Sequence, residues 1–176
     1  MAWAVLALCN FAFLIVALTS LGASYERFTW WGFTSFTLYT CIHAVLGPDA
    51  LKGVDIFFAT VALIIMFGVV AMAAINDGSS MLAQVVRDEG LLLYFVGTFI
   101  VHYFPVAVIL STCTEVRHLD RLEAKQIALA LSLFCLYLLY ENPESIYGVP
   151  IGQTLAAGGA LAFGIVAVFL LWRLET

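Results

Sequence analysis

Charged residues are scarce in this sequence. Of its 176 residues only 11% are Asp, Glu, Lys or Arg, whereas soluble domains carry about 25%. Hydrophobic residues make up 64% of the chain. A soluble fold of this length could not hide so much apolar surface inside itself. The composition therefore excludes an ordinary soluble domain and indicates an integral membrane protein.

Patterns for metal, nucleic-acid and glycan sites are also missing. The four cysteines lack the CxxC or Cys/His spacing of a zinc site, so we interpret them as buried small apolar residues. The charges are scattered, and no basic cluster indicates nucleic acid. No Asn-x-Ser/Thr sequence occurs. We expect no cofactor, no metal and no nucleic-acid partner, and membrane lipids as the environment.

The sequence has six long apolar stretches instead. A helix needs about 20 residues to cross roughly 30 Å of hydrocarbon, and backbone amides there must be satisfied internally. None of the stretches alternates like the strands of a membrane barrel. The predicted fold is all-α, a polytopic membrane protein with a bundle of about six transmembrane helices in one domain, 1–176. The expected helices are 2–22, 28–46, 56–75, 91–112, 126–140 and 151–172.

Loop chemistry separates these stretches. Gly, Pro, Asn and Asp residues occur at 47–49, 76–80 and 141–144, as is typical of chain turns. In 115–125 apolar residues recur every third position among charges, which predicts a helical extension into water. The first stretch resembles a signal peptide only in part, because no positive charge precedes it and its run exceeds the usual core of about 7–15 residues. We interpret it as a helix.

The distribution of Lys and Arg predicts the orientation. With six spans, both termini lie on the same face of the membrane. That face also holds Lys52, Arg117, Arg121, Lys125 and Arg173, while the opposite face holds Arg27 and Arg87. The positive-inside rule then places both termini in the cytoplasm. We expect a multi-pass protein of the endoplasmic reticulum or plasma membrane.

Small residues recur every fourth position in the last stretch. They are Gly152, Ala156, Ala160 and Gly164. Such a stripe allows another helix backbone to approach closely. We expect it to pack a helix of this chain or to form a homo-oligomer contact.

Two histidines lie inside the apolar stretches, which contain no Asp, Glu, Lys or Arg. His102 is near the middle of the fourth stretch and His43 toward the cytoplasmic end of the second. Polar groups within a membrane are costly and are the first candidates for function. Pro105 cannot donate to the Val101 carbonyl four residues earlier, so we expect a kink beside His102. His102 is either a neutral residue bonded to a neighbouring helix or a general base.

Hydroxyl groups are concentrated in the second stretch, which contains Thr29, Thr34, Ser35, Thr37 and Thr40. Hydroxyls in membrane helices usually bond to their own helix or to a neighbour, which is a structural role. A threonine becomes nucleophilic when a base takes its proton, and a histidine on another helix can do so.

These residues resemble the androgen-induced and androgen-dependent transmembrane proteins, a family of multi-pass hydrolases of lipid esters. Phe28-Thr29-Trp30 is similar to the aromatic–Thr–aromatic step that opens the family's second helix. His102 before Pro105 is similar to its histidine motif, and Tyr147-Gly148-Val149-Pro150 to its later loop. The resemblance implies an intramembrane hydrolase in which Thr29 attacks the ester carbonyl and His102 accepts the threonine's proton.

The expected depths of these residues disagree with that pairing. Counted from the helix ends at about 1.5 Å per residue, Thr29 and His102 differ in depth by roughly 15 Å. Thr34 or Thr37 would match His102 better. The motif favours Thr29 as the nucleophile, and the depth favours Thr37.

Two other function classes fit the same residues. In a small channel or transporter, His102 and the threonines would line a polar path, although such a protein would usually have more ionisable groups at mid-depth. In a non-catalytic membrane scaffold, the polar residues would only hold helices together. The hydrolase is the leading hypothesis, and both alternatives stay open at this point.

Overall fold

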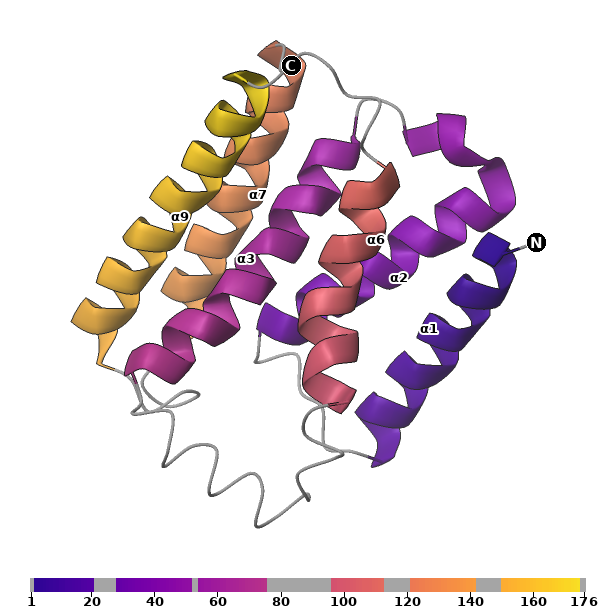
Figure 1. Cartoon of the computed structure of the whole chain (residues 1–176). Coiled ribbons are helices and arrows are strands. Elements are labelled where there is room, and N and C mark those ends of the chain that lie inside the picture. The colour runs from indigo at the N-terminus through magenta and orange to yellow at the C-terminus, as the bar shows by residue number, and fades with distance from the viewer. Residues whose placement is uncertain are drawn as a thin grey trace.

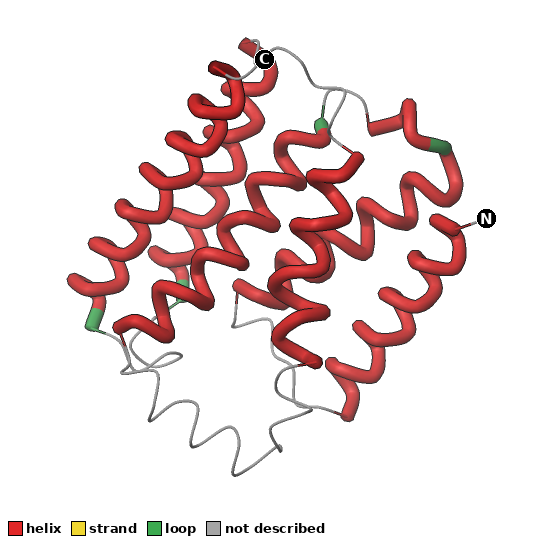
Figure 2. The backbone as a smooth tube through the Cα atoms, viewed as in Figure 1, coloured by secondary structure: helices red, strands yellow, loops and turns green. Residues whose placement is uncertain are grey.

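The computed structural model describes residues 2–20, 28–51, 54–75, 96–112, 121–141 and 150–174. Within these ranges the chain forms six α-helices and no strand (Figure 2). The all-α fold class is therefore confirmed. The expected turn at 76–80, residues 113–120 and the loop 147–149 lie outside the described residues.

The helices follow the apolar stretches in order along the chain. Their bounds are α1 Ala2–Ser20, α2 Phe28–Leu46, α3 Asp55–Ile75, α6 Phe104–Thr112, α7 Arg121–Tyr140 and α9 Ile151–Leu174. Two short elements complete them: the 3₁₀ turn η1, Pro48–Leu51, and the π-helical turn η2, Phe99–Tyr103, which runs directly into α6. The fifth apolar stretch, 126–140, is short for a membrane span. The helix that contains it, α7, has 20 residues because it begins earlier, at Arg121.

Helix α3 occupies the centre of the bundle. It contacts α2, α6, α7 and α9, while α1 packs on α2 (Figure 1). Every residue from Phe58 to Ile65 is buried. A helix enclosed on all sides must be apolar all round rather than on one stripe, which explains why this segment shows no amphipathic pattern.

The turn after α2 has a clear local cause. Gly47 has φ of +84°, a left-handed conformation that costs glycine little. Its N–H donates to the His43 carbonyl at 3.2 Å, and this arrangement ends a helix. The chain then enters η1, which directs it back toward α3.

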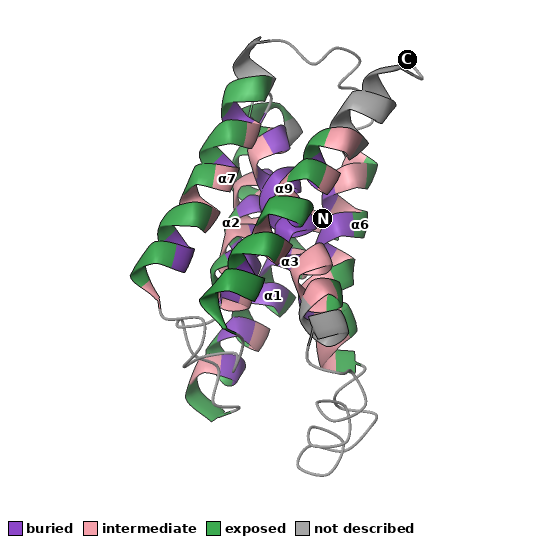
Figure 3. Ribbon diagram, turned by 90° about the vertical axis from the view of Figure 1, so that its left-hand side faces the viewer, coloured by how far each residue is buried: buried purple, intermediate pink, exposed green. Residues whose placement is uncertain are grey.

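The outer faces of the bundle are apolar. Figure 3 shows exposed residues along the outward sides of α7 and α9, and α1 likewise exposes Val5, Leu8 and Phe11. Large hydrophobic side chains there include Leu8, Leu139 and Phe163, which are 70%, 78% and 78% exposed. Among the described residues, one helix, Ala2–Ser20, has both the length and the apolar character to cross a membrane. Shorter apolar helices are Asp55–Ala71, Val96–Thr112, Ala124–Tyr140 and Ile151–Ala167.

The cysteine interpretation needs correction. Cys9 and Cys135 are exposed and Cys41 is half-buried, so these three are not core residues. They lie on helix faces that point away from the bundle axis, where an apolar thiol is compatible with hydrocarbon. Cys113 lies outside the described residues.

The small-residue stripe of α9 does not pack against any described helix of this chain. Gly152, Ala156 and Ala160 are exposed, and a side chain added at Gly152 or Gly164 would meet nothing within 4 Å. Instead α9 buries Thr154, Leu161 and Ile165. The expected packing of the stripe against a helix of the chain is thus wrong for the described residues, and the homo-oligomer contact stays a prediction.

Candidate active site

The two residues singled out by the sequence motifs lie together. Thr29 Oγ1 is 3.5 Å from His102 Nε2, although the two positions are 73 residues apart in sequence. Thr29 is the second residue of α2, and His102 belongs to η2. Both side chains are half-buried. The distance is at the long limit of a hydrogen bond, as is common for catalytic pairs before substrate binds.

The second ring nitrogen fixes how the imidazole can act. His102 Nδ1 is 3.1 Å from the Thr98 carbonyl oxygen. A carbonyl only accepts hydrogen bonds, so Nδ1 must carry the proton in the neutral ring. Nε2 then presents its lone pair to the Thr29 hydroxyl. This is the tautomer that a general base needs.

The depth argument for Thr37 does not hold in the structure. The Thr37 hydroxyl donates to the Phe33 carbonyl at 2.9 Å, and the Thr34 hydroxyl donates to the Trp30 carbonyl at 2.7 Å. Both are bonds to their own helix, the structural role that threonines usually have. The estimate counted residues from helix ends as if the helices were parallel. Helix α2 instead runs obliquely across the bundle, which brings its first turn beside η2 (Figure 1).

The first turn of α2 supplies a favourable setting for negative charge. The leading N–H groups of a helix have no acceptor within the helix, and the positive end of the helix dipole lies there. Thr29 is in this turn because α2 begins at Phe28. An oxyanion that forms on an acyl group attached to Thr29 would therefore develop at the end of the helix that stabilises it.

His102 has both exposed and buried neighbours in its own turn. Phe99 and Tyr103, in the same π-helical turn, are 57% and 38% exposed. On the opposite side Val101 is buried. Among the described residues, the imidazole thus lies between the packed interior and exposed apolar side chains.

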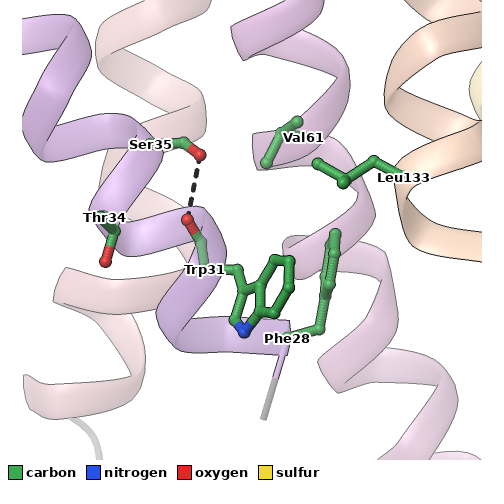
Figure 4. A pocket seen from close by; sticks show the side chains of 6 residues that line it. All are labelled: Phe28, Trp31, Thr34, Ser35, Val61 and Leu133. Atoms are coloured by element: carbon green, nitrogen blue, oxygen red, sulfur yellow. Dashed lines mark hydrogen bonds between the residues drawn. The ribbon is translucent and has the colours of Figure 1, made fainter. Parts of the chain in front are cut away.

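A cavity of about 250 Å³ lies elsewhere on α2. Phe28 and Trp31 line one wall and Val61 and Leu133 another, with Thr34 and Ser35 completing the lining (Figure 4). The Ser35 hydroxyl donates to the Trp31 carbonyl at 3.0 Å. Neither Thr29 nor His102 lines this cavity, so it is not the space in which their chemistry would take place.

The second histidine has a different environment. His43 is 5% exposed and stacks on Trp3 with ring centroids 4.4 Å apart. Neither of its ring nitrogens has a hydrogen-bond partner among the described residues. No hydroxyl is paired with it, so His43 lacks the arrangement that distinguishes His102.

Tyr39 is a polar residue that the motif analysis did not identify. Its hydroxyl lies 2.5 Å from Thr112 Oγ1 and also bonds with the Asp55 side chain. It therefore links α2 to both α6 and α3. A tyrosine in an apolar run gives no sequence signal for such a junction, because both partners come from distant helices.

A metal centre is not formed by the described part of the chain, where no three His, Cys, Asp or Glu side chains gather in a suitable group. No known protein family, curated protein or solved structure matches the chain.

Proposed function

We propose that this chain is a polytopic membrane protein whose helices form one bundle in the bilayer, with both termini in the cytoplasm. Support comes from the six apolar stretches and from the large apolar side chains on the outward faces of α1, α7 and α9. In water such faces would be unusually large apolar patches. In hydrocarbon they are the expected surface.

We infer that the protein hydrolyses lipid esters with Thr29 as nucleophile and His102 as general base. The observation that carries this proposal is the approach of Thr29 Oγ1 to His102 Nε2, with Nδ1 held by the Thr98 carbonyl. The resemblance to the androgen-induced and androgen-dependent transmembrane proteins points to the same two residues. Nucleophile, base and a group that orients the base are the elements of covalent acyl transfer.

In the first half-reaction, Thr29 Oγ attacks the ester carbonyl carbon while His102 Nε2 takes the hydroxyl proton. The tetrahedral intermediate has its negative oxygen near the first turn of α2. Its collapse breaks the bond to the alcohol, which leaves with the proton from Nε2. An acyl-threonine ester and a neutral imidazole remain.

In the second half-reaction, water attacks the acyl-threonine carbonyl and gives one proton to Nε2. The bond to Thr29 Oγ then breaks, and the proton returns from Nε2 to that oxygen. A fatty acid is released, and the enzyme is restored. The orienting partner here is a backbone carbonyl, so no carboxylate is required in the described site.

The position of the pair supports the proposed lipid substrate class. Phe99 and Tyr103 expose apolar surface beside His102, and a substrate dissolved in the membrane can reach this side without crossing water. A carbonyl at the end of a fatty chain would meet the first turn of α2, close to one end of the bundle.

Labelling with a fluorophosphonate probe tests the proposal directly. The purified chain in detergent should be labelled, and Thr29→Ala and His102→Ala should each abolish labelling. Thr37→Ala is the matched control, because among the described residues its hydroxyl bonds to the Phe33 carbonyl of its own helix and not to His102. Equal labelling of all four proteins would eliminate the assignment. Absence of labelling together with ion flux in liposomes would support the channel, and absence of both would support the scaffold.

A further inference from the structure

The turn that contains His102 is not α-helical. Phe99–Tyr103 forms a π-helical turn inside the helix 96–112, and the Phe104 N–H donates to the Phe99 carbonyl five residues earlier. Fewer than about 1% of residues adopt this conformation. Short π-turns inside α-helices are frequent at functional sites.

Pro105 gives a physical reason for the π-turn. It has no N–H to donate, and in an α-helix its ring would collide with the carbonyl of Val101. Both residues are buried. A wider turn before Pro105 gives the ring room and leaves the helix otherwise continuous.

The π-turn also changes the position of His102. One extra residue in a turn rotates the segments on its two sides by about 100° relative to each other. In an α-helix the Thr98 carbonyl would accept the backbone N–H of His102. Here the ring Nδ1 lies 3.1 Å from that carbonyl, and Nε2 points to Thr29.

We infer that Pro105 is a positioning residue, which holds the π-turn so that the Thr98 carbonyl anchors one nitrogen of His102 and the other faces Thr29. This inference rests on the proposed function, because the side chain that Pro105 positions is the proposed general base. The position of the His102 ring can nevertheless be measured without any hydrolysis, through the effect of the imidazole on a group placed at residue 29.

A thiol introduced by Thr29→Cys is such a reporter, in a full-length chain whose native cysteines are replaced by alanine. An adjacent imidazole lowers the pKa of a thiol from about 8.5 to 7.5 or less, which increases the thiolate about tenfold near pH 6.5. Alkylation by iodoacetamide should therefore be about tenfold faster with Thr29→Cys alone than with Thr29→Cys/His102→Ala. Adding Pro105→Ala should lower the rate to that of the His102→Ala protein.

Pro48→Ala is the matched control, since Pro48 lies in η1, outside the helix 96–112, and its removal should leave the fast rate unchanged. A fast rate retained in Pro105→Ala would overturn the positioning role while leaving the pair intact. A slow rate in Thr29→Cys alone would overturn both the positioning role and the proposed function. Fast, Pro105-dependent alkylation without probe labelling of the unmutated chain would remove the hydrolase but leave the positioning role standing.

A measurement on the unmutated chain covers the case in which Pro105→Ala fails to fold. Nitrogen-15 NMR distinguishes the two neutral imidazole tautomers, and a His102→Gln sample identifies the signals of this ring. We expect the proton on Nδ1, bonded to the Thr98 carbonyl. A proton on Nε2 would overturn the inference, because the base would then have no lone pair facing Thr29.

Discussion

Gly32 of α2 packs directly against Ile65 of α3. A Cβ atom at Gly32 would lie 1.4 Å from Ile65 Cδ1 and 2.7 Å from Cγ1, so the helices approach this closely only because residue 32 has no side chain. Gly32→Ala should destabilise the folded protein by about 1–3 kcal/mol through overpacking. Thermal unfolding in detergent, followed by circular dichroism, measures the change.

Gly68→Ala is the control for this prediction. Gly68 is also helical, but a Cβ there would meet nothing within 4 Å. Alanine should therefore be neutral or stabilise the helix by about 0.5–1 kcal/mol. Similar destabilisation by both substitutions would contradict this prediction, because a Cβ at Gly68 meets no neighbour that could be overpacked.

The buried imidazole of His43 should cost stability. It stacks on Trp3 and has no partner for either ring nitrogen among the described residues. An unpartnered buried polar group costs about 1–3 kcal/mol. His43→Phe keeps the aromatic contact and should be as stable as the unmutated protein or more so. His43→Ala loses the packing and should be less stable by about 2–5 kcal/mol. A marked loss of stability in His43→Phe would show that a ring nitrogen is hydrogen-bonded.

Thr29→Ser tests whether the hydroxyl rather than the side-chain shape matters. Serine retains the Oγ that lies near His102, so hydrolysis of a fluorogenic fatty-acyl ester in vesicles should continue. Thr29→Val keeps the shape without the hydroxyl and should reduce the rate at least about 100-fold. Equal rates for the valine and serine variants would exclude Thr29 as the nucleophile.

Asp55 should make stability depend on pH. It lies one residue before the apolar stretch 56–75, and burial raises the pKa of its carboxyl, an effect partly offset by the hydrogen bond with Tyr39. The folded state therefore favours the neutral form. The contribution of the neutral Asp55 carboxyl to stability is complete when the pH is below the pKa of the unfolded chain, near 3.8. It is lost as the pH rises through the pKa of the folded protein.

We expect the free energy of unfolding to increase as the pH is lowered from 7 toward about 4. Asp55→Asn should remove much of this slope. Stability that falls steadily over this pH range, and does so equally in Asp55→Asn, would contradict the prediction.

The sequence determined the helical content because long apolar runs leave the backbone few alternatives. α2 spans Phe28–Leu46, the residues of the second stretch, and Gly47 ends it. Other features escaped sequence analysis. Cys9 and Cys135 are exposed, and the stripe of α9 faces outward, because of which face of each helix meets a neighbour. A helix that is apolar on all sides does not encode that face in its sequence.

The candidate pair shows the same division. Sequence motifs singled out Thr29 and His102, and Pro105 predicted a disturbance of the helix beside the histidine. Whether the two side chains meet was decided only by tertiary structure, through the oblique path of α2 and the π-turn at Phe99–Tyr103. A local pattern specifies residue type and helix register, but the distance between groups 73 residues apart depends on how helices cross. Helix crossing is set by contacts such as Gly32 against Ile65, which one chain's periodicity does not reveal.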